Sequence, residues 1–91
     1  MRLSVQRGDP GFREDAGDGS WVVLLNGEPQ SPQRTGRAVV TADEAEGALW
    51  FHPCADDGSI LALADFGVPL VERVDGKVSI YRVRSEYLPA R

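Results

Sequence analysis

Hydrophobic and polar residues alternate along much of this chain with a period of two, the period at which side chains of a β-strand point to the same face. At positions 2–7, for example, Leu3 and Val5 alternate with polar neighbours. Runs rich in β-branched and aromatic residues recur between clusters of Gly, Pro, Asn and Asp. The pattern predicts strands at positions 2–7, 20–25, 37–41, 48–52, 69–74 and 77–84. The segment 60–64 could be a strand or a short helix, and the glycines that flank it, Gly58 and Gly67, favour a strand.

Two of the links between these runs carry a hairpin signal. Asn26-Gly27 follows the run 20–25, which is apolar on both faces and is therefore expected to be a central strand. Asp75-Gly76 separates the last two runs, and both dipeptides are typical of two-residue β-hairpin turns. Because Pro29 and Pro32 follow Asn26-Gly27, the return strand of that hairpin is expected to be short or to lie at a sheet edge.

Helices have little room in this pattern. Thr41 and Glu44 have the spacing of a helix capping box, which predicts one helical turn in the link 42–47. Short strands separated by frequent turn signals are typical of β-sandwiches and small barrels. We therefore predict an all-β fold, a single small barrel or sandwich of about six or seven short strands with at most one short helical turn.

Alternation also predicts which side chains form the core. On the strand 48–52, Trp50 lies on one face and Leu49 and Phe51 on the other, so we expect an internal strand and a buried Trp50. The expected core consists of Leu3, Val5, Trp21, Val23, Leu25, Val40, Trp50, Leu61, Leu63, Val71, Val78 and Ile80.

Length and composition limit the class of protein. The 91 residues suit one domain, expected to span 1–91 with residues 85–91 as a flexible or partner-binding tail. A single cysteine excludes a disulfide-bonded scaffold and an intramolecular zinc-finger framework. The longest unbroken apolar runs, 21–25 and 60–64, are far shorter than the roughly 20 residues that cross a bilayer. We expect a soluble protein that does not contact a membrane.

Charge is unevenly distributed along the chain. The net charge is −4, which disfavours direct nucleic-acid binding, and positions 38–72 contain seven acidic residues with no Lys or Arg. Acidic residues in turns are commonly solvated or capping groups, but gathered on one face they would imitate the phosphates of a nucleic acid. The residues that would form such an acidic face are Asp43, Glu44, Glu46, Asp56 and Asp57.

Few residues could carry chemistry. His52 and Cys54 could share a metal ion, but structural zinc needs four ligands and catalytic zinc three, and the chain has no other His or Cys. His52 beside Asp56 or Asp57 would be the best general base, yet no motif for a nucleophile, an oxyanion hole or a nucleotide accompanies it. The sequence therefore predicts no catalytic, metal or cofactor site and a protein that is not an enzyme.

Four segments carry a family resemblance. The stretches 5–13 (VQRGDPGFR), 40–50 (VTADEAEGALW), 67–71 (GVPLV) and 76–80 (GKVSI), in this order, resemble small uncharacterised proteins of tailed phages and prophages. The similarity spans positions 3 to about 81. It implies a phage context among the genes for virion assembly, and it brings no known catalytic residues.

The resulting hypothesis is a non-enzymatic phage protein that acts by protein–protein contact, as a virion structural or morphogenesis accessory such as a head decoration or head–tail component. Its expected partners are capsid or tail proteins and further copies of itself, in the host cytoplasm during assembly and then in the virion. Exposed strand edges and proline-rich loops would make the contacts. The candidate contact residues are Asp9, Pro10, Phe12, Pro29, Pro32 and Tyr87.

The alternative hypothesis is an acidic phage inhibitor of a host defence or transcription complex, resembling an anti-CRISPR protein or a nucleic-acid mimic. It requires the five acidic residues named above to lie on one exposed face with few arginines near it.

Overall fold

The computed structural model describes residues 1–62 and 67–83 of the chain. In this part the fold is all-β, as the sequence predicts: seven strands form two antiparallel sheets, and the helical structure is a single four-residue helix. The sheets form a sandwich-like arrangement and not a closed barrel. The predicted tail, 85–91, lies outside the described residues.

The first sheet has four strands in the order β1-β4-β5-β6. Leu49 and Phe51 of β5 are buried, and β5 lies between two partners, so the prediction of an internal strand is confirmed. The strands are β1 (Arg2–Ser4), β4 (Arg37–Asp43), β5 (Ala48–Pro53) and β6 (Glu72–Asp75).

The second sheet consists of β3 (Glu28–Pro29), β2 (Trp21–Leu25) and β7 (Val78–Arg82), with β2 in the centre. The predicted hairpin at Asn26-Gly27 is confirmed: both residues have positive φ, 52° and 85°, as a two-residue turn of the primed type requires. The return strand β3 is two residues long and lies at the sheet edge, as its prolines predict.

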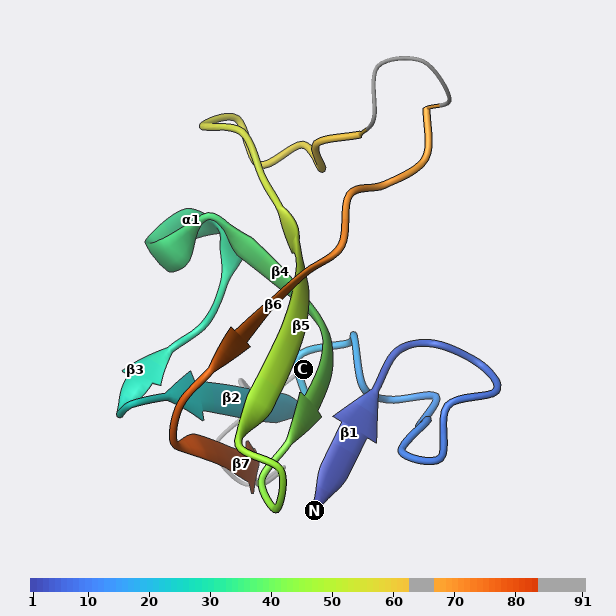
Figure 1. Cartoon of the computed structure of the whole chain (residues 1–91), viewed down its shortest axis with the longest axis vertical. Coiled ribbons are helices and arrows are strands. Elements are labelled where there is room, and N and C mark those ends of the chain that lie inside the picture. The colour runs from blue at the N-terminus through green and yellow to red at the C-terminus, as the bar shows by residue number, and fades with distance from the viewer. Residues whose placement is uncertain (63–66, 84–91) are drawn as a thin grey trace, which may run out of the picture.

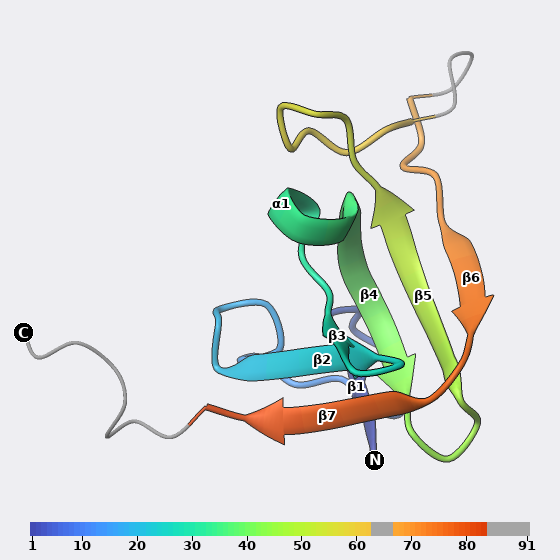
Figure 2. The ribbon, with the colours of Figure 1, turned by 90° about the vertical axis from the view of Figure 1, so that its left-hand side faces the viewer.

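The strands of the two sheets cross at a steep angle, so the sheets pack orthogonally (Figures 1 and 2). The core lies between them. The hydroxyls of Ser4 and Thr41 are also buried, and they form a hydrogen bond to each other at 2.8 Å. The buried core cluster is Leu3, Val23, Leu25, Ala42, Leu49, Phe51, Val78 and Ile80.

Asp75-Gly76 does not form the hairpin that the sequence predicts. The strands on its two sides, β6 and β7, belong to different sheets, so the dipeptide is a corner at which the chain crosses the sandwich (Figure 2). A Cβ atom on Gly76 would lie 2.9 Å from Leu25 Cδ1 and 3.0 Å from the Asn26 side chain. The glycine is required here because the β2–β3 turn packs directly against the corner.

The single helical turn lies elsewhere than predicted. The link between β4 and β5 is a hydrogen-bonded turn, in which Asp43 and not Thr41 accepts a hydrogen bond from the backbone N–H of Glu46 at 2.8 Å. Thr41 is a strand residue paired with Ser4. The helix is α1 (Pro32–Thr35), which begins after the N-cap Ser31 and ends at a left-handed Gly36.

Six of the predicted core residues are buried: Leu3, Val23, Leu25, Val40, Val78 and Ile80. Three predicted core residues are exposed instead. Val5 is exposed because β1 ends before it, and Leu61 and Val71 are exposed because they lie outside both sheets. Trp21 and Trp50 are half-buried, and Leu63 lies outside the described residues. The prediction omitted four buried residues that fill the centre of the first sheet, namely Ala42, Ala48, Leu49 and Phe51.

Candidate functional site

The chain leaves the two sheets between β5 and β6. We call this segment the arm; its described residues are 54–62 and 67–71. It projects from one end of the first sheet, away from the second sheet (Figures 1 and 2). Backbone hydrogen bonds give it a defined path: Leu61 N donates to Pro53 O at 2.9 Å, and Leu70 N donates to Leu61 O at 3.1 Å.

The arm exposes large apolar side chains. Ile60, Leu61, Val68 and Val71 are between 44% and 51% exposed. Two of them were predicted to be core residues, but no strand of the second sheet extends over them (Figure 2). One sequence signal is compatible with an apolar contact surface here. Only Asp65 is charged between Asp57 and Glu72, and the centres of protein interfaces are poor in charged residues.

His52, on β5, forms a hydrogen bond to the arm. Its Nδ1 lies 2.9 Å from the carbonyl oxygen of Leu70, and the Cys54 thiol lies 3.6 Å from the carbonyl oxygen of His52. Within residues 1–62 and 67–83, no carboxylate forms an ion pair with His52, and no group of three or more His, Cys, Asp and Glu side chains could hold a metal ion. These contacts give His52 a structural role.

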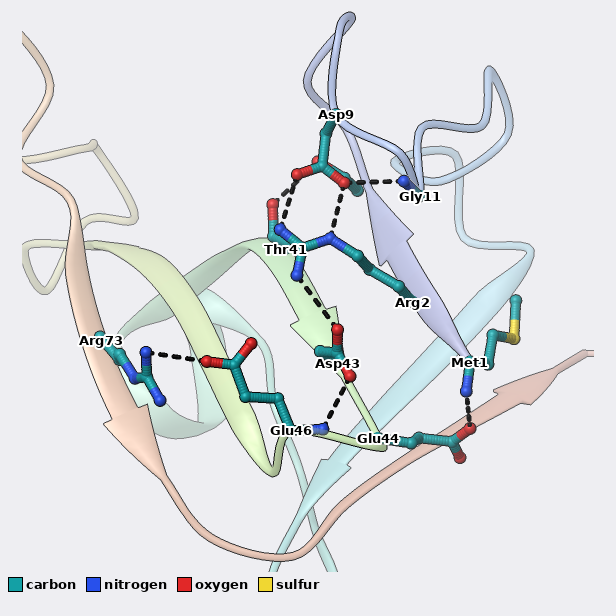
Figure 3. Close-up of polar contacts among 10 residues, drawn as sticks. Met1, Arg2, Asp9, Gly11, Thr41, Asp43, Glu44, Glu46 and Arg73 are labelled. Carbon is teal, nitrogen blue, oxygen red and sulfur yellow. Dashed lines mark hydrogen bonds and ion pairs between the residues drawn. The ribbon is translucent and has the colours of Figure 1, made fainter.

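Asp9, a predicted contact residue, is held in a polar network at the N-terminal strand (Figure 3). Its carboxylate accepts two hydrogen bonds from the Arg2 guanidinium, at 2.9 and 2.7 Å, and a third from Gly11 N at 2.8 Å. The Arg2 contact in particular lowers the pKa of the Asp9 carboxyl. Arg2 also donates to Asp43 at 3.1 Å. Asp9 therefore fixes the loop 8–13 against β1.

The other predicted contact residues do not gather at one place. Pro10 is exposed in the loop after β1, and the Arg7 guanidinium covers the half-buried ring of Phe12 at 5.1 Å from the ring centroid. Pro29 lies on the edge strand β3 and Pro32 in the first turn of α1. Tyr87 lies outside the described residues.

The five residues of the predicted acidic face separate into two groups. Asp43 ends β4, and Glu44 and Glu46 lie in the turn that follows, whereas Asp56 and Asp57 lie in the arm after β5. The first group is largely neutralised: Arg2 binds Asp43, the N-terminal ammonium binds Glu44 at 3.0 Å, and Arg73 binds Glu46 at 3.0 Å (Figure 3). The arrangement does not provide the single exposed, arginine-poor face that nucleic-acid mimicry requires.

The acidic pair in the arm has its own local role. Asp57 accepts hydrogen bonds from the backbone N–H and the hydroxyl of Ser59, at 2.9 and 2.6 Å, which lower the pKa of the Asp57 carboxyl. Asp56 is exposed, and its carboxylate forms no hydrogen bond or ion pair within the described part of the chain. Asp56 is thus a carboxylate that another molecule could reach.

Trp50 is half-buried and not, as predicted, a fully buried packing residue. Its ring lies under two guanidinium groups, those of Arg2 and Arg73, at 5.2 and 5.1 Å from the centroid. Trp21 has the same arrangement with two other arginines. Together with Phe12 and Phe51, four aromatic rings lie within 5.5 Å of an arginine guanidinium.

An open cleft of about 450 Å³ lies between β1, β2, β4 and the segment 30–33. Val5, Trp21 and Val39 form much of its apolar wall, and Gln30 and Arg37 are among its polar groups. Its volume lies within the range of ligand-binding pockets, roughly 300–1,000 Å³. Local sequence pattern does not indicate this cleft, because its walls come from segments far apart in the chain.

The chain matches no protein-family model, no curated protein and no solved structure. Among the described residues, no helix is long and apolar enough to span a lipid bilayer.

Proposed function

We propose that this chain is a non-enzymatic phage protein that acts by protein–protein contact, and that the arm makes the contact. Its partner would be a capsid or tail protein, as for a virion structural or morphogenesis accessory. The observation that carries this proposal is the exposure of Ile60, Leu61, Val68 and Val71 on a segment that projects from the sandwich.

Energetics favour the arm over the other surfaces. Complete burial of a fully exposed aliphatic side chain contributes about 1.5–3 kcal/mol. The four side chains are already about half-buried, so docking offers roughly half of that gain for each of them. The backbone hydrogen bonds from Leu61 to Pro53 and from Leu70 to Leu61 already define much of the arm's path, which reduces the entropy lost on docking. Exposed apolar clusters of this kind commonly mark protein interaction sites.

The virion context is supported by the resemblance of the segments 5–13, 40–50, 67–71 and 76–80 to phage and prophage proteins. A virion presents many symmetric copies of each docking site, so a small protein can reach high occupancy through a modest interface.

The experiment is mass spectrometry of purified virions produced by the phage or prophage whose genome encodes this chain. The proposal predicts that the chain co-purifies with intact particles after extensive washing, at a copy number set by particle symmetry. Its absence from intact particles, with the chain present in the lysate, would contradict the proposal.

A further inference from the structure

Arg37 gives the cleft a distinct electrostatic character. It is the only cationic residue among the described cleft residues, and no acidic residue lines the cleft, although the chain as a whole has a net charge of −4. The guanidinium of Arg37 donates to Gln30 Oε1 at 3.1 Å and lies 5.0 Å from the centroid of the Phe51 ring. Arg2, Arg13 and Arg73 pair with carboxylates, but Arg37 forms no ion pair within residues 1–62 and 67–83.

The occupant that suits this cleft combines apolar side chains with a carboxylate. The apolar walls favour apolar side chains. Arg37, which has no carboxylate partner, favours a carboxylate, since guanidinium–carboxylate pairs are among the stronger polar contacts. The arm has both properties. It carries the exposed Ile60 and Leu61 and the unpaired Asp56, and it contains no Lys or Arg.

We propose that the arm of one copy of this chain inserts into the cleft of a second copy, with Ile60 and Leu61 against the apolar wall and Asp56 facing Arg37. The inference rests on the proposed function in one respect, since the same arm makes the contact; here the arm's partner is a second copy of this chain and not a capsid or tail protein. The arm points away from its own sandwich (Figures 1 and 2), so the cleft it enters belongs to another molecule.

Insertion of this kind uses two different surfaces of each copy, and it can be reciprocal about a twofold axis or one-way from copy to copy. One-way contacts generate rings where the rotation closes and filaments where it does not. A one-way assembly that has not closed keeps one free arm and one free cleft, at its two ends. Reciprocal insertion therefore predicts a dimer and one-way insertion predicts larger assemblies; in both, association requires an intact arm and an intact cleft.

The experiment uses two kinds of variant of the full chain. In the arm variant, Ile60→Ser and Leu61→Ser remove two exposed apolar side chains and leave the cleft intact. In the cleft variant, Arg37→Glu reverses the cationic group and leaves the arm intact; Val5→Glu, at a cleft position that is 41% exposed, is a second cleft variant should Arg37→Glu impair folding. Circular dichroism and thermal melting verify that each variant folds.

Matched controls place the same changes outside both surfaces. Arg34→Glu reverses an exposed arginine of α1 that does not line the cleft, and Tyr81→Ser removes a side chain that is 57% exposed on β7. Both are expected to associate like the wild type.

Sedimentation velocity over a range of concentrations gives the result. We expect concentration-dependent assembly of the wild type, association at least about tenfold weaker for each variant alone, and a heterodimer in an equimolar mixture of arm and cleft variants. The mixture is decisive, because one intact arm and one intact cleft remain and only one contact can form. A wild type that stays monomeric, or a mixture that stays monomeric while the wild type assembles, would overturn the inference.

Failure of this inference and failure of the proposed function are distinguishable. A monomeric chain that still enters virions overturns only self-insertion. A chain that assembles as described but is absent from virions overturns only the virion role.

Discussion

Glu44, in the turn after β4 of the first sheet, accepts a hydrogen bond through Oε2 from the backbone N–H of Ile80 on β7 of the second sheet, at 2.9 Å. Its other oxygen lies 3.0 Å from the α-amino group of Met1. One carboxylate thus joins the two sheets and the N-terminus. These contacts explain why Glu44 does not cap a helical turn, as the capping-box spacing predicted. Its side chain binds β7 and the N-terminus and not the backbone of its own turn.

Replacing Glu44 with Ala should destabilise the fold by about 1–2 kcal/mol, because a charge-assisted hydrogen bond and an ion pair are lost from a partly exposed position. Urea denaturation at neutral pH measures the loss. Glu14→Ala is the matched control, since the Glu14 side chain is exposed and forms no bond within the described chain. Equal midpoints for the two variants would show that Glu44 does not couple the sheets.

Stability should decline at acidic pH. The hydrogen bond from Ile80, and then the N-terminal ammonium, lower the pKa of the Glu44 carboxyl, and Arg2 lowers that of Asp9. A carboxyl whose pKa is lower in the folded chain stabilises the fold above its unfolded pKa, and this contribution is lost as the pH falls through the folded pKa. We expect urea midpoints to fall below about pH 5. Glu44→Gln should show a smaller fall; an unchanged pH dependence would contradict this assignment.

Gly11→Ala should be strongly destabilising. A Cβ at this position would lie 2.7 Å from the backbone carbonyl carbon and oxygen of Arg2, and backbone atoms cannot move aside without disturbing β1. We expect a cost of about 1–3 kcal/mol from this overpacking. Gly17→Ala serves as the control, because the new Cβ would meet only Val5 Cγ1 at an ordinary 3.5 Å. Thermal melting that shows equal effects for the two substitutions would rule out the close approach at Gly11.

Trp50→Ala should cost about 1–3 kcal/mol, less than truncation of a fully buried tryptophan, because the ring is half-buried beneath Arg2 and Arg73. Trp50→Phe keeps an aromatic face for both guanidinium groups and should lose less stability than Trp50→Ala. The two variants are compared by urea denaturation. If Phe is no better than Ala, the stacking on the ring contributes little.

The sequence predicted the all-β class and the approximate positions of most strands because the relevant signals are local. Asn26-Gly27 formed its hairpin since both positions tolerate positive φ, and Pro29 ended the return strand. The alternation of Leu49, Trp50 and Phe51 identified an internal strand. These properties depend on a residue and its immediate neighbours.

The errors arose where distant segments decide the outcome. Asp75-Gly76 has the composition of a hairpin, but its neighbours pair with β5 and β2, which lie in different sheets, so the dipeptide became a corner. Leu61 and Val71 have the hydrophobicity of core residues, but the second sheet does not extend to them. The cleft near Arg37 could not be predicted from local pattern, because β1, β2 and β4 build it together.

The most direct test of the arm as a contact site is competitive incorporation into particles. Wild-type chain and the Ile60→Ser, Leu61→Ser variant, labelled with different isotopes and supplied in equal amounts during assembly, are quantified in purified virions by mass spectrometry. We predict a ratio of at least about ten to one in favour of the wild type, with Tyr81→Ser incorporated as well as the wild type. Equal incorporation of the arm variant and the wild type would contradict the account.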